Sequence, residues 1–273
     1  MLGDYNIMLN KTFISILTSI SLTIITNTSY TENTNYINNN HETMNNYNSL
    51  KWYKTSAEKK AIYHEVFNYG YEKIYNKVIN NKLESSTWGI ISDIDETVLD
   101  NTDYNKQNLK DAKEFNLKLF YKSLAEEKSQ ATPGSQSFTC KIQQLGGKVI
   151  FVTNRDGTFD KNVIPATINN LKKVGICFDN ILFAKGSKAT DMDKNPRFNA
   201  VINGNYKNVL STTTMKAINI IGYFGDNIQD FPNIYQNDLK NLDDNDVIFS
   251  QFGNTYFELP NPTYGSWEKN TFL

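Results

Sequence analysis

The stretch from Ile90 to Leu99 reads Ile-Ile-Ser-Asp-Ile-Asp-Glu-Thr-Val-Leu and indicates the fold class. An apolar run that ends in polar residues is typical of a buried strand that leads to the ligand-binding edge of a parallel sheet. Asp93 and Asp95 are two positions apart, so on extended backbone their side chains point to the same side. Two such carboxylates repel each other unless a cation or a shared proton compensates. The pattern favours a nucleophile beside a general acid and a divalent metal, whereas a lone pair of this kind is more often a solvated turn.

Two later stretches of the chain repeat this arrangement. One apolar run ends in Thr153 and Asn154, whose hydroxyl and amide groups suit phosphate oxygens. Another ends just before Asp226, and Asp230 follows four residues later. Because the carboxyl ends of parallel strands meet at one edge of a sheet, we expect these groups to lie together. Three such strands in this order are a much stronger signal than any one of them.

The order of the expected elements predicts an α/β fold. Apolar residues at helical and strand spacing alternate along the chain, which favours a parallel sheet with helices on both faces. Ser56 is the expected N-cap of a long first helix. The expected helices are Ser56–Leu83, Leu109–Lys128, one from Pro133 to Gly147 and Ile164–Lys173, and the expected later strands are Val149–Val152, Ile181–Ala184, Ile218–Phe224, Val247–Phe249 and Tyr256–Leu259.

The two aspartate signatures resemble those of a known family. The stretches Asp93–Asn101 and Gly225–Phe231 look like the paired motifs of the class C acid phosphatases, a family of the haloacid dehalogenase (HAD) superfamily that includes the bacterial lipoprotein e type. The resemblance implies a Rossmann-like parallel sheet flanked by helices, with a small helical subdomain. It also covers Leu50–Glu58, Pro133-Gly134, Val152–Arg155 and Leu259–Glu268, and so runs from about Leu50 to Trp267.

The resemblance also implies a mechanism. It predicts a Mg²⁺-dependent acid phosphatase that hydrolyses phosphomonoesters, in particular nucleoside 5'-monophosphates, through an aspartyl-phosphate. Asp93 would attack phosphorus, and Asp95 would protonate the leaving group and then activate water. One Mg²⁺ per chain would be held by Asp93, the backbone carbonyl of Asp95 and Asp226. Asp230 would ligate the ion directly or orient one of its waters.

Groups for the phosphate follow from the same resemblance. The Thr153 hydroxyl and the backbone amide of Asn154 would hold phosphoryl oxygens, and a lysine should neutralise the remaining charge. The family spacing of this lysine before an arginine is matched by Lys194. Lys185 and Lys188 are competing choices, because the loop around them does not align cleanly with the family pattern.

Three aromatic residues are candidate platforms for a nucleobase. Tyr104, Tyr264 and Trp267 lie near the matched motifs. An equally favoured alternative for Tyr264 and Trp267 is that they pack the C-terminus, since aromatic side chains bury much apolar area. The family's tryptophan before Pro133 has no counterpart in this sequence, so base selectivity can differ from that of other members.

Composition excludes several other classes of protein. The chain has 273 residues, of which 39% are hydrophobic, enough for a packed core. Its net charge of -1 offers no electrostatic case for binding a nucleic acid polymer. His41 and His64 are the only histidines, too few for phosphohistidine or dinuclear purple phosphatases. The sequence also lacks a P-loop, a Cys-x5-Arg loop and a G-x-S-x-G elbow.

The N-terminus has the pattern of an export signal. Lys11 precedes an apolar stretch that is interrupted by hydroxyls and is shorter than the roughly 20 apolar residues that a membrane span needs. We expect a signal peptide over 1–28 with its cleavage site undetermined, a disordered Asn/Thr-rich spacer over 29–48, and a phosphatase domain over 49–273. A buried strand or an anchor is the alternative for the apolar stretch. No cysteine for lipid attachment follows it, so we expect an exported protein, periplasmic or secreted, without a stable membrane anchor.

The sequence leaves three questions open. Cys140 and Cys177 could form a disulfide or remain two buried thiols. The same residues could serve a phosphotransferase that passes the phosphoryl group to an alcohol, and storage relatives of the family lose the nucleophile, although Asp93 is intact here. The oligomeric state is not determined, and a homodimer is compatible with the sequence.

Overall fold

The computed structural model describes residues 47–271. The expected signal peptide lies outside the described residues, as does the expected spacer apart from its last two positions. Those two positions belong to a helix that covers 47–55. Within the described part of the chain, no helix combines the length and the apolar character needed to cross a bilayer.

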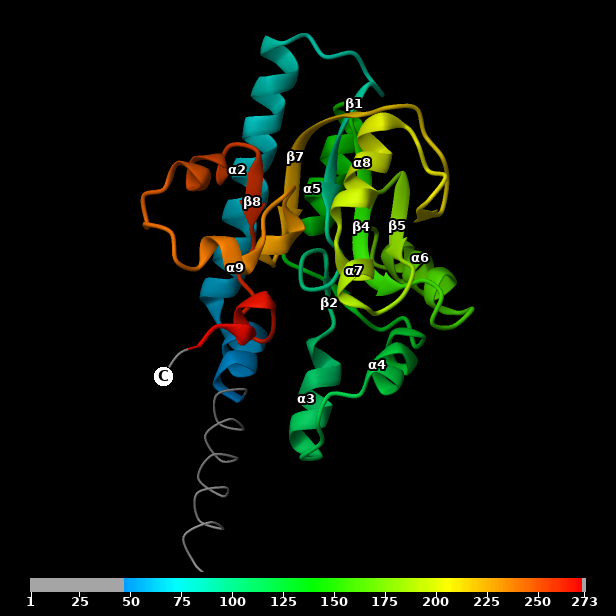
Figure 1. Cartoon of the computed structure of the whole chain (residues 1–273), viewed down its shortest axis with the longest axis vertical. Helices are drawn as coiled ribbons and strands as arrows, with labels where there is room; N and C mark the ends of the chain where they lie inside the picture. Colours follow the sequence, from blue (N-terminus) through cyan, green and yellow to red (C-terminus); the bar gives the residue numbers. More distant parts are fainter. Residues whose placement is uncertain (1–46, 272–273) are drawn as a thin grey trace, which may run out of the picture. The chain divides into compact units, whose positions relative to one another are not determined.

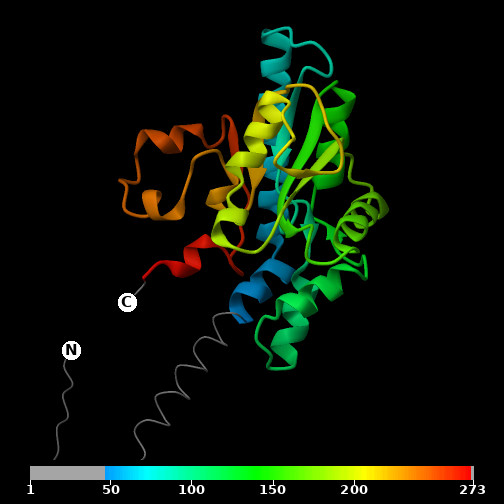
Figure 2. The same ribbon diagram turned by 45° about the vertical axis from the view of Figure 1, so that its right-hand side comes forward.

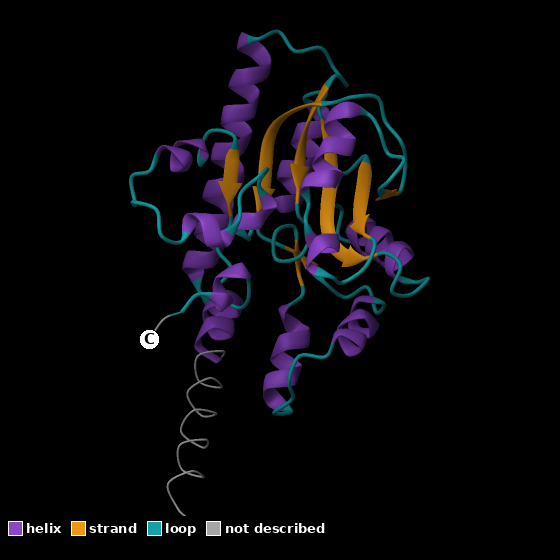
Figure 3. Cartoon of the chain, viewed as in Figure 1, coloured by secondary structure: helices purple, strands orange, loops and turns teal. Residues whose placement is uncertain are grey.

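A six-stranded sheet forms the centre of the fold (Figures 1 and 3). Neighbouring strands run parallel except β6, which pairs antiparallel with β5 at one edge. This topology confirms the predicted α/β class with a mostly parallel sheet. In sheet order the strands are β6 (Leu210–Ser211), β5 (Asn180–Ala184), β4 (Lys148–Asp156), β1 (Trp88–Ser92), β7 (Asn219–Gly225) and β8 (Tyr256–Glu258).

Helices cover both faces of this sheet, which explains the continuous apolar runs of its strands. Ile90 and Ile91 are both buried, but successive side chains of a strand point to opposite faces, and the two residues belong to separate cores. Figure 2 shows α8 (yellow) and α5 (green) on opposite sides of the strands. The core of Ile90 includes residues of α2 (Ala57–Asn80), α5 (Ser135–Gln144) and α6 (Val163–Lys173), and that of Ile91 includes residues of α8 (Asn195–Asn203).

The long first helix begins where the sequence predicts. The Ser56 side chain accepts the N–H of Lys59 at 3.1 Å and so caps α2. Buried residues along α2 recur at helical spacing and pack on the sheet, among them Phe67 and Ile74.

The helix expected over Leu109–Lys128 is wrong in its extent. The structure has two helices in this region, α3 (Thr102–Lys110) and α4 (Leu117–Leu124). Ala112 adopts a positive φ of 49°, which ends the first helix. The Asn116 side chain then caps the second by accepting the N–H of Leu119 at 3.1 Å.

Helices α3 and α4 form the small helical subdomain that the family resemblance implies. They lie between β2 (Leu99–Asp100) and β3 (Gln130–Ala131), which pair as an antiparallel ribbon. Figure 1 shows them beyond the ends to which the strand arrows point, the side where the motif residues gather.

The strand expected over Val247–Phe249 is also wrong. Residues Val247–Gln251 form a 3₁₀ helix, η2. The Asp246 side chain accepts the N–H of Ile248 at 3.0 Å, and this cap favours a helical turn over extended backbone. The remaining short helices are α7 (Ala189–Met192), α9 (Gln236–Leu239), η1 (Ile228–Asp230) and η3 (Ser266–Lys269).

The two cysteines form a disulfide. Cys140 in α5 is bonded to Cys177, 37 positions later and just before β5, which settles the question that the sequence leaves open. The disulfide connects α5, on one face of the sheet, to the segment that leads into β5. A cross-link over a loop of this length stabilises a fold by roughly 3–4 kcal/mol in the chain-entropy account.

Candidate active site

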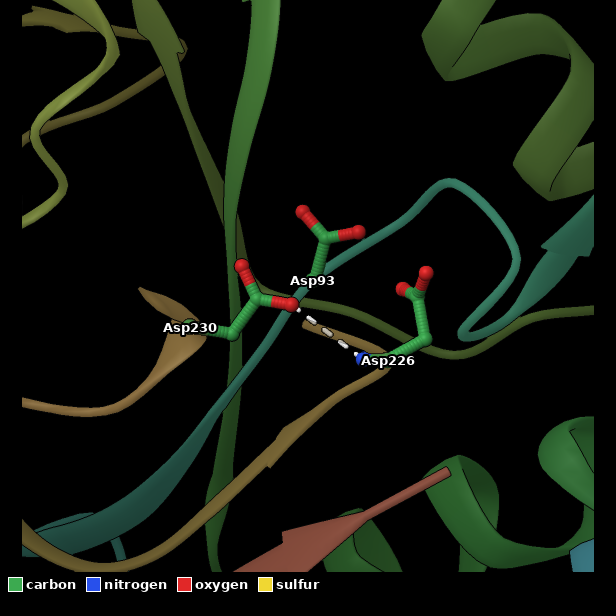
Figure 4. Close-up of side chains that lie close together, drawn as sticks. All are labelled: Asp93, Asp226 and Asp230. Carbon is green, nitrogen blue, oxygen red and sulfur yellow. Dashed lines mark hydrogen bonds between the residues drawn. The ribbon is translucent and has the colours of Figure 1, made fainter. Parts of the chain in front are cut away.

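Three aspartates meet at the carboxyl edge of the sheet. Asp93 follows β1, Asp226 follows β7, and Asp230 ends the short helix η1. All three are buried, and each offers a carboxylate oxygen within 4.8 Å of the others. Figure 4 shows the three side chains around one space. Such a set of hard oxygen donors can hold a divalent cation.

Lys194 is the lysine that reaches this cluster. Its Nζ donates to Asp93 Oδ1 and lies 2.7 Å from Asp230 Oδ1, with only 3% of its side chain exposed. Lys185 donates instead to the backbone carbonyl of Asn208 at 3.0 Å. Within residues 47–271, Lys188 forms no ion pair. Of the three candidates, the structure therefore brings only Lys194 to the aspartates.

The site has an excess of buried negative charge. Burial raises the pKa of Asp93 to about 7, although Lys194 opposes the shift. Burial also raises the pKa of Asp226 well above its usual range, and the charges of Asp93 and Asp230 add to that shift. Burial tends to lower the pKa of Lys194, but Asp230 and Asp93 outweigh it and raise the pKa overall. A bound cation would relieve this repulsion.

Both carboxylate oxygens of Asp226 are held by neighbours that sequence reasoning missed. The Thr97 hydroxyl donates to Oδ1 at 2.6 Å, and the Asn261 amide donates to Oδ2 at 2.8 Å. Thr97 lies in the first motif and Asn261 in the C-terminal matched segment. Both residues lie in stretches that match the family motifs, and this could have marked them as site residues. The sequence does not show that they contact Asp226, because they are far from it along the chain.

Asp95 lies outside the aspartate cluster and forms its own ion pair. The Arg155 guanidinium donates to both oxygens of Asp95, and the Asn101 amide donates to Oδ1 at 2.5 Å. Arg155 is itself buried and donates to the Thr167 hydroxyl of α6 at 2.9 Å. Sequence reasoning missed Arg155 and Asn101, although both lie inside matched motifs.

Thr153 and Asn154, the candidate phosphate-binding residues of β4, form hydrogen bonds with two arginines. The buried Thr153 hydroxyl accepts the N–H of Arg155 at 3.1 Å. Arg197 donates to the Asn154 side-chain oxygen at 2.7 Å and also to the Thr153 carbonyl. Burial lowers the pKa of Arg197 to about 10, a shift that Asp93 and other acids partly oppose. Lys194 is the N-cap residue of α8 and Arg197 lies in its first turn, so the start of α8 is linked to the end of β4.

The three aromatic candidates lie in different surroundings. The Tyr264 hydroxyl bonds to the carboxylate of Glu96 in the first motif. Trp267 is 42% exposed and packs close to Gly265. Tyr104 belongs to the helical subdomain, where its hydroxyl donates to the Asn116 carbonyl at 2.9 Å. Its ring packs there on Phe115 and Phe120. The side chain of Tyr264, but not that of Tyr104, therefore bonds directly to a motif residue.

Known proteins share this fold. The family model of the HAD superfamily, subfamily IIIB (Acid phosphatase), matches residues 10–267. Two structures of the class C acid phosphatase from Bacillus anthracis are also similar, each with a TM-score of 0.66 over 83% of this chain and 87% of the other. The structure with tungstate bound is 26% identical in sequence, and the second is 27% identical.

The fold and the site together define a phosphatase of the HAD superfamily. The chain belongs to its subfamily IIIB, the acid phosphatases, and the predicted family is confirmed. It is therefore a phosphomonoesterase that acts on small phosphate esters. Phosphatases of this superfamily generally use a divalent metal, and the three buried aspartates are suited to bind one.

Proposed function

We propose that this protein is an exported, Mg²⁺-dependent acid phosphatase that hydrolyses nucleoside 5'-monophosphates and similar esters through an aspartyl-phosphate on Asp93. The observation that carries the proposal is the meeting of Asp93, Asp226, Asp230 and Lys194 at one edge of the sheet. Carboxylates for a cation and a buried ammonium group beside the nucleophile are what transfer of a phosphate dianion requires.

Magnesium fits the chemistry of the donor set. The three aspartates offer carboxylate oxygens, which Mg²⁺ prefers, and their mutual repulsion favours a bound cation. The Asp93 carboxylate, the Asp95 carbonyl and Asp226 would hold the ion, with Asp230 as an outer partner. The bound ion would reduce the repulsion between Asp93 and the phosphate dianion.

Asp93 is the proposed nucleophile. Lys194 engages its Oδ1, so we assign the attack on phosphorus to Oδ2. A bond forms between Oδ2 and phosphorus while the bond to the leaving oxygen breaks, and Asp95 gives its proton to that oxygen. Asp95 then takes a proton from water, which attacks phosphorus, releases inorganic phosphate and restores the Asp93 carboxylate.

The phosphate would be held by groups on two elements. The Thr153 hydroxyl and the backbone N–H of Asn154 are proposed to donate to its oxygens. The Thr153 and Asn154 donors are uncharged, so Lys194 would neutralise part of the negative charge of the phosphate. Charged donors form the stronger hydrogen bonds to phosphate. Arg197 fixes the end of β4 to α8 and so keeps these groups in register.

A nucleoside leaving group is supported by the C-terminal segment. Trp267 presents a half-exposed indole, and Tyr264 lies against the first motif through Glu96. A base could stack on either ring. Tyr104 is a weaker candidate, since both its hydroxyl and its ring are engaged within the helical subdomain.

Export is supported by two features of the chain. Lys11 and the apolar stretch after it fit a signal peptide. The bond between Cys140 and Cys177 is of a kind that persists in oxidising compartments such as the periplasm or the extracellular medium.

The proposal is tested by two variants of the first motif. Asp93→Asn should leave every ester inert and form no phosphoenzyme. Asp95→Asn should slow an alkyl ester roughly 10²–10⁴-fold, because the proton donor is lost. Cleavage of p-nitrophenyl phosphate, whose leaving group departs unprotonated, should suffer less in its first step, and phosphoenzyme should accumulate. If both esters lose the same rate and no intermediate is trapped, Asp95 does not transfer the proton. Phosphotransfer is tested separately by adding a nucleoside acceptor and measuring how much phosphate it receives.

A further inference from the structure

Glu258 is a partly buried acidic residue that none of the proposed steps uses. It is the last residue of β8, at the same edge of the sheet as the aspartates. Its Oε2 is shielded from solvent and has no hydrogen-bond partner among the described residues. A buried carboxylate oxygen without a donor is unfavourable for folding, so Oε2 calls for a partner that residues 47–271 do not supply.

The strand register places Glu258 next to Asp230. Glu258 is paired with Gly225 of β7, and paired residues direct their side chains to the same face of a sheet. Asp230 occupies the space above Gly225, since a Cβ added to Gly225 would lie 2.3 Å from Asp230 Cβ and 2.5 Å from its Oδ2. Asp230 and Glu258 are therefore lateral neighbours on one face. Phe257, the preceding residue, packs in the core of the opposite face.

The donors around Asp230 are already used. Its Oδ1 pairs with Lys194, and its Oδ2 accepts the backbone N–H groups of Asp226 and Asn227 at 3.2 and 3.0 Å. Burial raises the pKa of Glu258 well above its usual range, and the negative charges of Asp230 and Asp226 add to the shift. The neighbouring carboxylates can only accept hydrogen bonds, so Oε2 of Glu258 lacks a donor, and a water bound to a cation at the aspartates would supply one.

We infer that Glu258 is a positioning residue of the cation site, an outer carboxylate that strengthens divalent binding through a cation-bound water without touching the cation. The inference rests on the proposed cation site, which Asp93, the Asp95 carbonyl and Asp226 would form with Asp230 as an outer partner. Mg²⁺ usually keeps several waters, and these waters need acceptors. Outer partners of this kind typically change metal affinity by roughly 10–100-fold when they are removed.

This role predicts two effects of opposite sign in Glu258→Gln. Without metal, the variant loses a repulsive charge, so its melting temperature should equal or exceed that of the unaltered chain. With Mg²⁺, its dissociation constant by titration calorimetry should rise roughly 10–100-fold. The rise in melting temperature that Mg²⁺ produces should shrink accordingly. Glu258→Met, of similar length, should behave in the same way and shows that the glutamine amide is not responsible.

A matched control is Glu65→Gln, which removes one carboxylate from the exposed side of α2 and should leave Mg²⁺ affinity unchanged. Unchanged Mg²⁺ affinity in both Glu258 variants would overturn the inference, whatever happens to the melting temperature. In that case, a higher melting temperature would identify an inert buried acid, and a lower one a purely structural contact. If the unaltered chain binds no Mg²⁺, the proposed cation site itself fails, and the role of Glu258 fails with it.

Discussion

The Arg155 guanidinium holds the Asp95 carboxylate by both of its oxygens. Nε lies 3.1 Å from each oxygen and Nη2 lies 2.7 Å from Oδ1. The Arg155 side chain is only 2% exposed, and Thr167 fixes it from α6. Two-point contacts of this kind set orientation as well as distance. Asp95 is therefore presented in one orientation, apart from the aspartate cluster.

Arg155→Lys should impair proton transfer more than metal binding, because an ammonium group cannot reproduce the two-point contact with Asp95. We expect kcat for an alkyl phosphate to fall roughly tenfold to a hundredfold, the range for a misplaced catalytic group. The loss for p-nitrophenyl phosphate should be smaller. Steady-state kinetics on both esters measure the difference.

The control for this prediction lies on the same strand. Lys148 begins β4 and pairs with Asp179 at 3.0 Å, so Lys148→Gln also removes an ion pair from β4. It should leave the ratio of the two rates unchanged. If Arg155→Lys reduces both rates equally, Arg155 supports the strand rather than the orientation of Asp95.

Asn261→Ala should weaken Mg²⁺ binding by about 10–100-fold, because it frees one of the two held oxygens of Asp226. Thr97→Val should act in the same direction through the other oxygen. Titration calorimetry measures both. Ser266→Ala is the control, since this hydroxyl lies in the same C-terminal segment as Asn261 but donates to the Asn227 side chain and not to Asp226. An Mg²⁺ affinity equal in all three variants and the unaltered chain would show that Asp226 needs no such support.

Chelation should abolish phosphatase activity, and added Mg²⁺ should restore it. The physical reason is that Asp93, Asp226 and Asp230 repel one another and an incoming phosphate dianion when no cation is present. Activity after exhaustive EDTA treatment and dialysis, followed by Mg²⁺ titration, measures the dependence. Full activity of the metal-free protein would contradict the metal assignment.

The gathering of site residues at the carboxyl edge of the sheet could be predicted from sequence, because in each contributing strand an apolar run leads to polar residues. Asp93, Thr153 and Asp226 follow apolar runs, and parallel strands align their carboxyl ends. The pairing of Arg155 with Asp95 could not be predicted in this way. It joins residues 60 positions apart, and no local periodicity records such a contact.

The errors in the predicted elements have a different cause. The helix expected over Leu109–Lys128 and the strand expected over Val247–Phe249 are wrong because the pattern of apolar residues does not reveal which polar side chain will cap a helix. Single caps decided the outcome, at Asn116 in the first case and at Asp246 in the second. The position of Glu258 beside Asp230 could not be predicted from the sequence either, because it depends on the register of β8 on β7.

Removal of the disulfide should lower stability and leave catalysis intact. Cys140→Ser combined with Cys177→Ser opens a loop of 37 positions, a loss of roughly 3–4 kcal/mol in the chain-entropy account. For a domain of this size that corresponds to a melting temperature lower by roughly 6–16 °C. Thermal unfolding and kcat at 25 °C measure the two effects. A drop in kcat together with unchanged stability would show that the bridge shapes the site instead of the fold.

Trp267→Ala should raise KM for a nucleoside 5'-monophosphate more than for a small aliphatic phosphate. Its indole is 42% exposed, and stacking of a base on one aromatic ring contributes roughly 1–3 kcal/mol, which corresponds to a roughly 5- to 140-fold rise in KM. Tyr264→Phe keeps the second ring and removes only its bond to Glu96, so its effect should be similar for both substrates. Equal rises in KM for both substrates in Trp267→Ala would assign this residue to packing of the C-terminus, because a loss of packing does not depend on the leaving group.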